Sequence, residues 1–313
     1  MLYISLKEIA EKFPNKLAVN DMTYSELISN ALARPYVSIC HETGVNVLLD
    51  VLKAASINKP IIVLPKDDRE SAIIPVDLPD KFLVVLYSSG STGVRKPIIL
   101  PETMIMASVK NVIRLHNIVP EDKILTVCSL NHTAGLTCHT LGGLLSGASI
   151  VVEQFSPFSL LRLLEEHGIT LAHILPIMSE AVMKSHVKPN LSKLRIVWTG
   201  SDCITRQQIE YWLNPTCDLF FGYGMTEVGP PTTYHMLKYG DDLSMFDRGY
   251  PVGTQILCES KIIDNELWVK GDIVNIEGWF QTGDCFKYED GWFFYTGRKK
   301  AGGKIVPKGS VHF

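Results

Sequence analysis

The first 240 residues alternate short apolar runs with amphipathic stretches, which predicts strands separated by helices. The runs KPIIVLP at 59–65 and DKFLVVLYSS at 80–89 have the length and composition of buried strands. Helical spacing marks 102–118, and 156–168 begins with Ser-Pro and ends with His-Gly, the start and stop signals of a helix. Because strands joined through helices pair in parallel, we expect an α/β fold of βαβ layers with mostly parallel sheets. The remaining strands are predicted at 122–130, 149–154, 169–176, 194–201 and 218–224, and the remaining helices at 137–148, 179–186 and 205–214.

The pattern changes after residue 240. Short aromatic runs alternate there with polar residues and are interrupted by Gly, Pro, Asp and Asn, as in NELWVKG and GWFFYTG. Such runs predict antiparallel strands. We therefore expect an α/β core over 1–240, a small antiparallel, β-barrel-like subdomain over 241–297, and a basic, Gly-rich tail over 298–313 that is too short for a domain.

Composition narrows the class of protein. The 313 residues are 46% hydrophobic and 20% charged, as in a globular protein, and the net charge of −3 provides no positive field for a nucleic-acid partner. Seven cysteines, an odd number without a C-x-x-C pair, indicate buried thiols in a reducing compartment and neither disulfides nor zinc. No apolar signal core starts the chain and no uncharged apolar run approaches the ~20 residues of a membrane span, so we expect a cytoplasmic protein without one.

The string SSGSTGVRK follows an apolar strand and is the strongest candidate for chemistry. Glycines let backbone N–H groups approach an anion, the hydroxyls add donors, and Lys96 adds a positive charge. These features predict a loop that holds phosphate. It is not a Walker loop, because Gly90 and Gly93 have the wrong spacing to Lys96. Pro97 stands where Ser or Thr would follow, so a kinase or ATPase is only a remote alternative.

Three further strings carry polar residues suited to a nucleotide. In FGYGMTEVG, a Gly-Tyr-Gly turn would present Tyr223 as a stacking surface, and Glu227 is an oxygen ligand suited to Mg²⁺. In WFQTGD, Asp284 is suited to accept hydrogen bonds from a ribose. In YTGRKK, Arg298 supplies a fixed fork of donors. Each of these strings alone is also typical of a turn.

In this order, the four strings resemble the motifs of the adenylate-forming family, which comprises acyl-CoA synthetases, firefly-type luciferases and the adenylation domains of peptide synthetases. The resemblance covers most of the chain and implies the family's large N-terminal domain, with 1–240 as its adenylation core. The four strings lie at 88–96, 221–229, 279–284 and 295–300. Three more segments are similar to that family: FPNKLAVNDMTYSEL at 13–27 to its opening segment, SLNHTAGL at 129–136 to its acyl-pocket motif, and RGYPVGTQI at 248–256 to the strand entering its β-barrel subdomain.

The resemblance implies a role for each matching residue. The implied catalytic residues are Lys96, Thr226 at the α-phosphate, Glu227 as the Mg²⁺ ligand, and His132 at the border of the acyl pocket. The implied phosphate loop consists of Ser88, Ser89, Gly90, Ser91, Thr92, Gly93 and Lys96. The implied adenosine pocket consists of Tyr223 and Gly224 on adenine, Gly200 and Ser201 on the opposite wall, and Asp284 and Arg298 at the ribose. Lys300 falls at the family's hinge.

The resemblance implies an AMP-forming acid–thiol ligase. ATP would activate a carboxylic acid as an acyl adenylate with release of pyrophosphate, and the acyl group would pass to a thiol. The implied cofactors are ATP and Mg²⁺, with CoA or the phosphopantetheine of an acyl carrier protein as the acceptor. The string SLNHTAGL lacks the Asp that adenylation domains use for an amino group, which favours a plain aliphatic or aryl acid.

The chain departs from the family pattern in length. The segment before Ser88 is compressed, and we expect the family's small, mobile C-terminal domain to be absent, with 298–313 as a remnant of the hinge. That domain supplies a lysine to the reaction, and Lys304 and Lys308 do not match its motif. Losing such a charge costs ~10²–10³ in rate. Three alternatives follow: an excised large domain, an enzyme whose partner supplies the missing part, and a nucleotide- or acyl-adenylate-binding pseudoenzyme.

Overall fold

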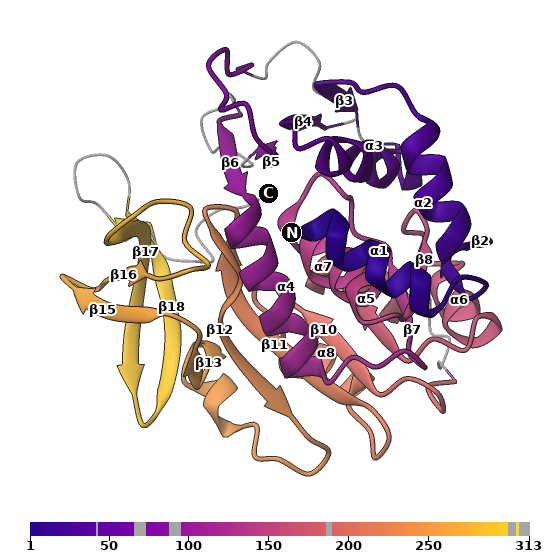
Figure 1. Ribbon diagram of the computed structural model, residues 1–313. Coiled ribbons are helices and arrows are strands. Elements are labelled where there is room, and N and C mark those ends of the chain that lie inside the picture. Colours follow the sequence, from indigo (N-terminus) through magenta and orange to yellow (C-terminus); the bar gives the residue numbers. More distant parts are fainter. Residues whose placement is uncertain (42, 66–72, 88–94, 186–189, 300–304, 307–313) are drawn as a thin grey trace.

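The computed structural model describes residues 1–313 except 42, 66–72, 88–94, 186–189, 300–304 and 307–313 (Figure 1). Its largest sheet has the strand order β14-β12-β11-β10-β9-β7-β8-β1-β2. Neighbours from β11 to β1 in this order pair in parallel, whereas β2, β12 and β14 pair antiparallel. The predicted parallel core is confirmed. The bounds are β1 Leu17–Val19, β2 Met22–Thr23, β7 Lys123–Thr126, β8 Ser149–Val152, β9 Leu171–His173, β10 Ile196–Thr199, β11 Asp218–Met225, β12 Val228–Leu237 and β14 Gln255–Ile256.

Two smaller sheets flank the large one. The first has the order β3-β4-β5-β6, with β3 Ile39–His41, β4 Ile61–Leu64 and β5 Leu83–Tyr87 parallel and β6 Pro97–Pro101 antiparallel. The second is antiparallel throughout and contains β13 Tyr250–Gly253, β18 Trp292–Lys299, β17 Phe280–Glu289, β16 Glu266–Lys270 and β15 Glu259–Ile263 in that order, with β19 Ile305–Val306 beside β18. The antiparallel sheet predicted near the C-terminal end is therefore confirmed. Its boundaries at 241 and 297 stay a prediction.

Helices cover both faces of the large sheet. Successive side chains of a strand point to opposite sides, so each strand can contribute to two apolar cores. In β7, Ile124 belongs to one apolar core and Leu125 to the other. Figure 1 shows α4 crossing in front of this sheet. The first core is formed with α1 Leu2–Lys12, α2 Tyr24–Ala33, α3 Val45–Ser56, α4 Glu102–His116, the π-helix η1 Ala134–Leu141 and α5 Gly142–Leu145. The second is formed with α6 Leu160–Glu166, α7 Pro176–Met183 and α8 Arg206–Trp212, and the 3₁₀ helix η2 Ser244–Asp247 follows later.

The helix predicted at 137–148 begins earlier and takes a different form. It is a π-helix over Ala134–Leu141 that continues as α5. Threonine hydroxyls bond main-chain oxygens inside it, with Thr137 donating to Thr133 at 2.6 Å and Thr140 donating to Gly135 at 2.7 Å. Such hydroxyl bonds compete with the regular helical ladder, and π-helical turns occur often at functional sites.

Three buried histidines lie between the large sheet and its first helical layer. His173 of β9 stacks on Trp198 of β10 with ring centroids 4.8 Å apart, and His139 of η1 meets the same Trp edge-on at 4.4 Å. His116, from the end of α4, meets Phe220 at 4.5 Å. Burial is the main cause that lowers the pKa of each histidine, to about 3 for His116 and His173. The cluster is therefore neutral and acts as part of the apolar core.

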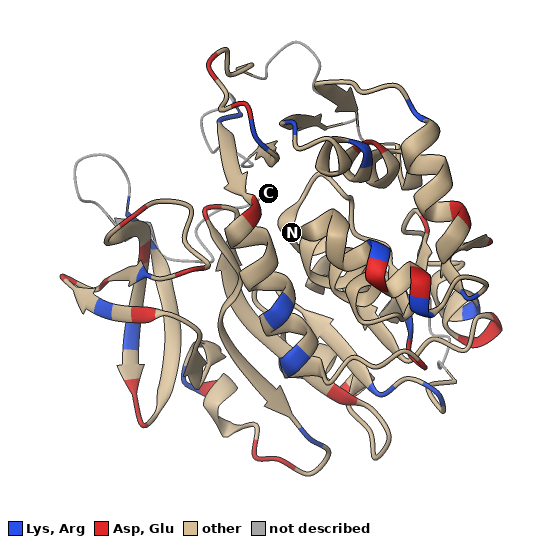
Figure 2. Ribbon diagram, viewed as in Figure 1, with Lys and Arg blue, Asp and Glu red and all other residues tan. Residues whose placement is uncertain are grey.

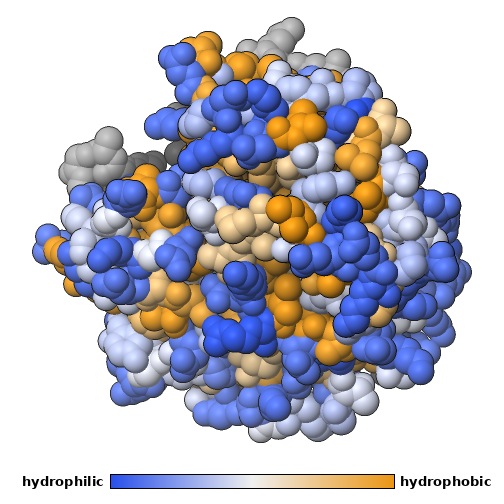
Figure 3. All heavy atoms as spheres, in the orientation of Figure 1, coloured by the Kyte–Doolittle hydropathy of each residue, from blue (hydrophilic) through white to orange (hydrophobic). Residues whose placement is uncertain are grey.

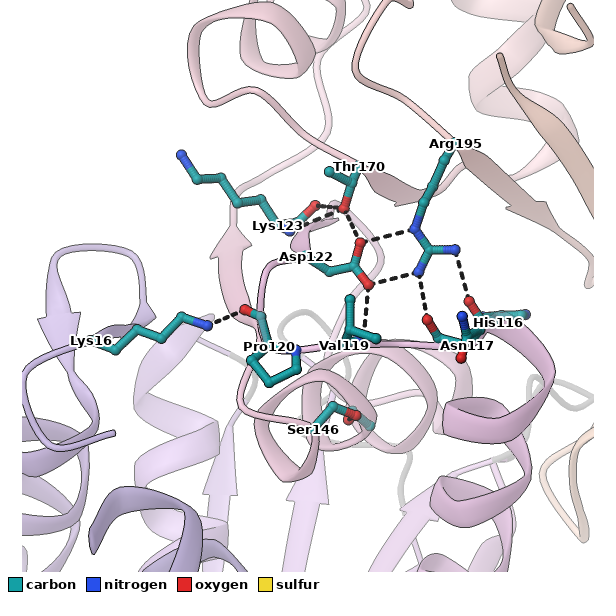
Figure 4. A network of polar contacts seen from close by, with 11 residues as sticks. Lys16, His116, Asn117, Val119, Pro120, Asp122, Lys123, Ser146, Thr170 and Arg195 are labelled. Atoms are coloured by element: carbon teal, nitrogen blue, oxygen red, sulfur yellow. Dashed lines mark hydrogen bonds and ion pairs between the residues drawn. The ribbon is translucent and has the colours of Figure 1, made fainter. Parts of the chain in front are cut away.

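One arginine fastens the C-terminal end of α4 to the sheet (Figure 4). Arg195 contacts the buried Asp122 through Nε at 2.9 Å and Nη2 at 2.6 Å, and it donates to the main-chain oxygens of His116 and Asn117. Thr170 donates to Oδ1 of Asp122 at 2.7 Å, the oxygen that Nε of Arg195 also contacts. Burial alone would raise the pKa of Asp122, but the hydrogen bonds, with that of Arg195 foremost, lower it. Asp122, Thr170 and Arg195 come just before β7, β9 and β10, so this network lies at the amino ends of these strands, away from the site described next.

The surface carries mixed charges. In Figure 2, Lys and Arg alternate with Asp and Glu over the visible face, in keeping with the net charge of −3. Figure 3 shows apolar atoms on this face as patches among hydrophilic ones. In the described part of the chain, no helix is both long and apolar enough to cross a membrane. Five of the seven cysteines are buried, as the sequence predicts.

Candidate functional site

A two-residue turn between β11 and β12 carries Thr226 and Glu227. Met225, at the end of β11, pairs with Val228, at the start of β12, so the turn is a tight hairpin. Both turn residues are half-buried. The long antiparallel ladder below them fixes the positions of a hydroxyl and a carboxylate side by side.

Tyr223 lies inside β11, so the predicted Gly-Tyr-Gly turn is wrong. A Cβ atom on Gly222 would lie 2.2 Å from the oxygen of Thr233, and one on Gly224 would lie 2.9 Å from Cβ of Pro230. These glycines therefore allow β12 to approach β11 closely and do not turn the chain. The chain turns at Thr226 and Glu227, directly after β11 ends at Met225.

Asp284 of β17 faces Tyr223, and the two residues join the large sheet to the antiparallel sheet. The Tyr223 hydroxyl donates to Oδ2 of Asp284 at 2.8 Å, and Asp284 is only 4% exposed. Arg298 is its register partner on β18 and places Nε 3.6 Å from Oδ1. Asp284 and Arg298 thus lie on strands, although their sequence strings taken alone are also typical of turns. The structure brings Tyr223, Asp284 and Arg298 together, as the resemblance implies.

Burial has the largest effect on the pKa values of Asp284, Glu227 and Tyr223. Loss of water raises the pKa of Asp284, and the positive charge of Arg298 opposes that effect. Loss of water also raises the pKa of Glu227, on which Arg298 and Asp284 act in opposite directions. The pKa of Tyr223 is far above its usual value, first because of burial and then because of the charge of Asp284. The tyrosine therefore stays a donor, and both carboxylates would gain from donors or a cation brought by a ligand.

Gly200 and Ser201 follow β10 and lie beside β11. A Cβ atom on Gly200 would be 3.2 Å from the oxygen of Gly222. Ser201 is exposed and has a left-handed φ of 65°. The predicted opposite wall of the nucleotide pocket therefore adjoins the strand that carries Tyr223.

His132 lies in the turn just before η1, with its side chain exposed to solvent. The protein around it still removes enough water to lower its pKa, and the charge of Arg95 acts in the same direction. A thiol connects this helix to the hairpin, because Cys138 of η1 donates to the main-chain oxygen of Pro230 at 3.3 Å. The predicted acyl-pocket residue thus lies at the start of a helix that contacts β12.

Most of the predicted phosphate loop lies outside the described residues, namely Ser88, Ser89, Gly90, Ser91, Thr92 and Gly93. Lys300, Lys304 and Lys308 lie outside them as well. Lys96 is described and exposed, one residue before β6. The strands on either side, β5 and β6, form an antiparallel pair in which Tyr87 is the partner of Pro97.

The residues present suit a magnesium ion that arrives with phosphate. Among the described residues, no group of three or more His, Cys, Asp or Glu side chains could hold a metal ion. Glu227 offers one partly desolvated carboxylate. Mg²⁺ is commonly bound through one or two carboxylates together with substrate phosphates, so a single glutamate is sufficient on the protein side.

The sequence alone did not reveal two other residues of this site. The Tyr295 side chain also hydrogen-bonds Asp284, and Glu266 accepts a bond from the main chain of Gly283 at 2.9 Å. The available signal for Glu266 was its position, since it is a charged residue at the start of the otherwise apolar run ELWV. Buried charges of this kind are rare and normally have a partner.

The family model for AMP-binding enzymes matches residues 33–275. Similar curated proteins include 4-coumarate–CoA ligase 5 from Oryza sativa subsp. japonica, 31% identical over 265 residues that cover 72% of this chain and 49% of the relative. Indoleacetate–CoA ligase from Aromatoleum aromaticum is 28% identical over 263 residues, which cover 74% of this chain and 51% of that protein. The chain spans about half the length of these relatives.

Solved structures agree in fold. Unliganded O-succinylbenzoate coenzyme A synthetase from Bacillus subtilis has a TM-score of 0.76 at 16% identity, over 98% of this chain and 85% of that one. The N-terminal domain of FACL13 from Mycobacterium tuberculosis has a TM-score of 0.75 at 16% identity, over 95% of this chain and 99% of that one. The chain thus has the fold of a shortened N-terminal portion of such proteins. The family model matches most of the chain, and the matched segment includes the hairpin with Thr226 and Glu227. This chain therefore belongs to the AMP-binding enzyme family.

Proposed function

We propose that this chain binds ATP beside the β11–β12 hairpin and activates a carboxylic acid as an acyl adenylate, for transfer to the thiol of CoA. Membership of the AMP-binding enzyme family and relatives named as CoA ligases support this function. The observation that carries it is the convergence of Tyr223, Asp284 and Arg298 with Glu227, on strands and a turn from two sheets.

Asp284 is suited to bind the ribose hydroxyls. Tyr223 bonds Oδ2, and Arg298 approaches Oδ1, so the carboxylate has a fixed orientation. Each carboxylate oxygen has further lone pairs for hydroxyl donors. Because burial disfavours the charged form of Asp284, donors from a ribose would stabilise that form.

The hairpin turn is suited to the phosphates. The Thr226 hydroxyl would donate a hydrogen bond to an oxygen of the α-phosphate. Lys96, one residue before β6, would contribute positive charge. Glu227 would hold Mg²⁺, which when bound neutralises charge on the phosphates and the leaving pyrophosphate. The protein thus opposes the repulsion between a carboxylate and a polyanion by fixed charges and donors.

The acid enters this proposal as an aryl or aliphatic carboxylate. His132 lies exposed before η1, at the position where the resemblance implies the border of the acyl pocket. The relatives' names include 4-coumarate and indoleacetate, so aryl acids come first in a substrate panel. CoA is the proposed acceptor, with an acyl carrier protein as the second candidate.

The test is acid-dependent exchange of labelled pyrophosphate into ATP by the full chain. The panel contains 4-coumarate, indoleacetate, benzoate and fatty acids of increasing length. We expect exchange with at least one acid, and Glu227→Gln should lower its rate about 10²-fold or more, the effect of losing a preorganised charge. The control, Glu289→Gln, alters a half-buried carboxylate at the end of β17 that pairs with Arg248 and Lys287, and it should keep the wild-type rate.

The possible results separate the alternatives. Exchange that is lost on Glu227→Gln and retained in Glu289→Gln supports ligation chemistry. Tight ATP binding without exchange for any acid, even after addition of a C-terminal portion from a relative, would favour a nucleotide-binding pseudoenzyme. Formation of ADP would contradict the proposal.

A further inference from the structure

Glu266 is a buried carboxylate next to the ribose-binding candidate Asp284. It begins β16 and is only 8% exposed. Its two oxygens have different partners: Oε1 accepts from the main-chain N–H of Gly283 at 2.9 Å, and Oε2 contacts Nζ of Lys299 at 3.0 Å. One side chain therefore links β16 to both β17 and β18.

The strand ladder is interrupted where Glu266 makes these bonds. Glu266 pairs with Cys285 and Trp268 pairs with Gln281, so one residue of β16 faces three of β17, Thr282 to Asp284. The regular main-chain ladder cannot serve all three. Side chains take its place: Glu266 accepts from Gly283, and the Thr282 hydroxyl donates to Leu267 O at 2.8 Å and accepts from the N–H of Asp284 at 3.1 Å.

Gly283 gives this bulge its shape. Its φ is 72°, a left-handed conformation that other residues adopt only with strain. A Cβ atom there would meet nothing within 4 Å, so the glycine serves the backbone conformation and not close packing. The direction of the next side chain, Asp284, depends on this conformation. The bond from Gly283 to Glu266 therefore restrains the residue just before Asp284 from the β16 side.

The charges form two neighbouring pairs. Arg298 and Lys299 are consecutive on β18, with Arg298 beside Asp284 and Lys299 on Glu266. Without the carboxylate of Glu266, the Lys299 ammonium would lose its ion-pair partner on β16, next to the Arg298 that pairs with Asp284.

We propose that Glu266 is a positioning residue of the nucleotide site, which holds the Thr282–Asp284 bulge and retains Lys299 so that Asp284 stays directed at the ribose. This inference rests on the proposed function, because it takes Asp284 as the group that binds the ribose hydroxyls. Glu266 itself does not touch the nucleotide.

The test compares AMP with 2′-deoxy-AMP and 3′-deoxy-AMP by calorimetry on the full chain. The ratio of dissociation constants measures how well Asp284 uses the ribose hydroxyls. Wild type should prefer AMP, and Asp284→Asn sets the ratio expected without that preference. Glu266→Ala should weaken AMP about tenfold or more, as expected when a hydrogen bond to a charged group is lost, and leave the deoxy analogues nearly unchanged. Glu266→Gln keeps an acceptor for Gly283 but not the charge, so its ratio should fall between those of wild type and Glu266→Ala.

A matched control is Glu259→Gln on the neighbouring strand β15, where Glu259 makes an exposed pair with Lys270. It should leave every affinity unchanged. A purely structural role for Glu266 would lower the melting temperature, or weaken all three nucleotides equally, with the ratio unchanged, and that result overturns the inference. Should Glu266→Ala fail to fold, Glu266→Gln, which preserves the volume, decides the question by the same ratio. Absence of AMP binding or of any ribose preference in wild type would instead overturn the proposed function, and this inference with it.

Discussion

Tyr223 and Asp284 are separated by 61 positions in the sequence, yet the tyrosine hydroxyl donates to Oδ2 of the aspartate at 2.8 Å. The first residue belongs to the large sheet and the second to the antiparallel sheet. This bond stabilises the ionised form of Asp284 against the effect of burial. The ribose site therefore depends on how the two sheets meet.

Tyr223→Phe should make nucleotide binding more sensitive to acid. Removing the hydroxyl takes away a bond that lowers the pKa of Asp284, so this carboxyl group would be protonated at a higher pH. We expect AMP affinity to fall several-fold at neutral pH and to decline at a higher pH than in wild type. Titration of AMP binding from pH 5 to pH 8 checks this. Tyr288→Phe, at an exposed position on β17, is the control, and an identical acid limb in wild type and Tyr223→Phe would contradict the expectation.

Asp284→Asn should stabilise the fold while it weakens ligand binding. The pKa of Asp284 is raised in the folded state, so its ionisation costs stability as pH rises through that folded value. The neutral amide avoids this cost. We expect the melting temperature to rise by about 1–3 °C at pH 8, with the gain shrinking as the pH falls. Thermal unfolding at several pH values measures it, and a lower melting temperature at pH 8 would refute the stated balance of burial and Arg298.

Arg195→Met should destabilise the fold strongly. It would leave Asp122, which is 3% exposed, without its cation and would also remove the bonds to the end of α4. Breaking a buried pair from one side is costly, and we expect a loss of about 2–4 kcal/mol at pH 7. Urea unfolding gives the value. The matched control is Arg162→Met, which breaks an exposed pair with Glu166 on α6 and should cost no more than about 0.5 kcal/mol.

The buried histidines should make the fold sensitive to acid. His116 and His173 have pKa values lowered to about 3, far below the unfolded value, so their contribution is complete above pH 6.5 and is lost as pH falls from there toward 3. Each should cost about 2 kcal/mol between pH 8 and pH 5. Because His139 contributes in the same way, His173→Phe, which retains the ring contact with Trp198, should remove about a third of the combined loss from the three histidines. Denaturant unfolding at the two pH values tests this, with the exposed His167→Gln as the control; an unchanged pH dependence in His173→Phe would contradict it.

The fold could be predicted from the sequence where burial requires a simple hydrophobic pattern. The apolar runs at 59–65 and 80–89 contain β4 and β5, because strands covered on both faces are almost wholly apolar. The same logic failed for β12. Its segment contains Gly229, Pro230 and Pro231, which are rare in strands, so propensity gave no sign of the hairpin. The tertiary packing against β11 overrides that preference.

The candidate site was predictable only as separate strings. The resemblance placed Tyr223, Asp284 and Arg298 in one pocket, and the structure brings them together. The contact of Glu266 with Gly283 could not be predicted, because it depends on a register irregularity between β16 and β17. Hydrophobic periodicity does not report such an irregularity.

The hairpin turn has only two residues, Thr226 and Glu227, and both are anchored by the same pair of strands. Neither side chain has a hinge of its own. Under the proposed function, the group that handles the reacting phosphate and the group that handles its counter-ion cannot drift apart when a ligand enters or leaves. An insertion of one residue here would uncouple them, and evolution or design would therefore find this turn far less tolerant of changed length than of changed side chains.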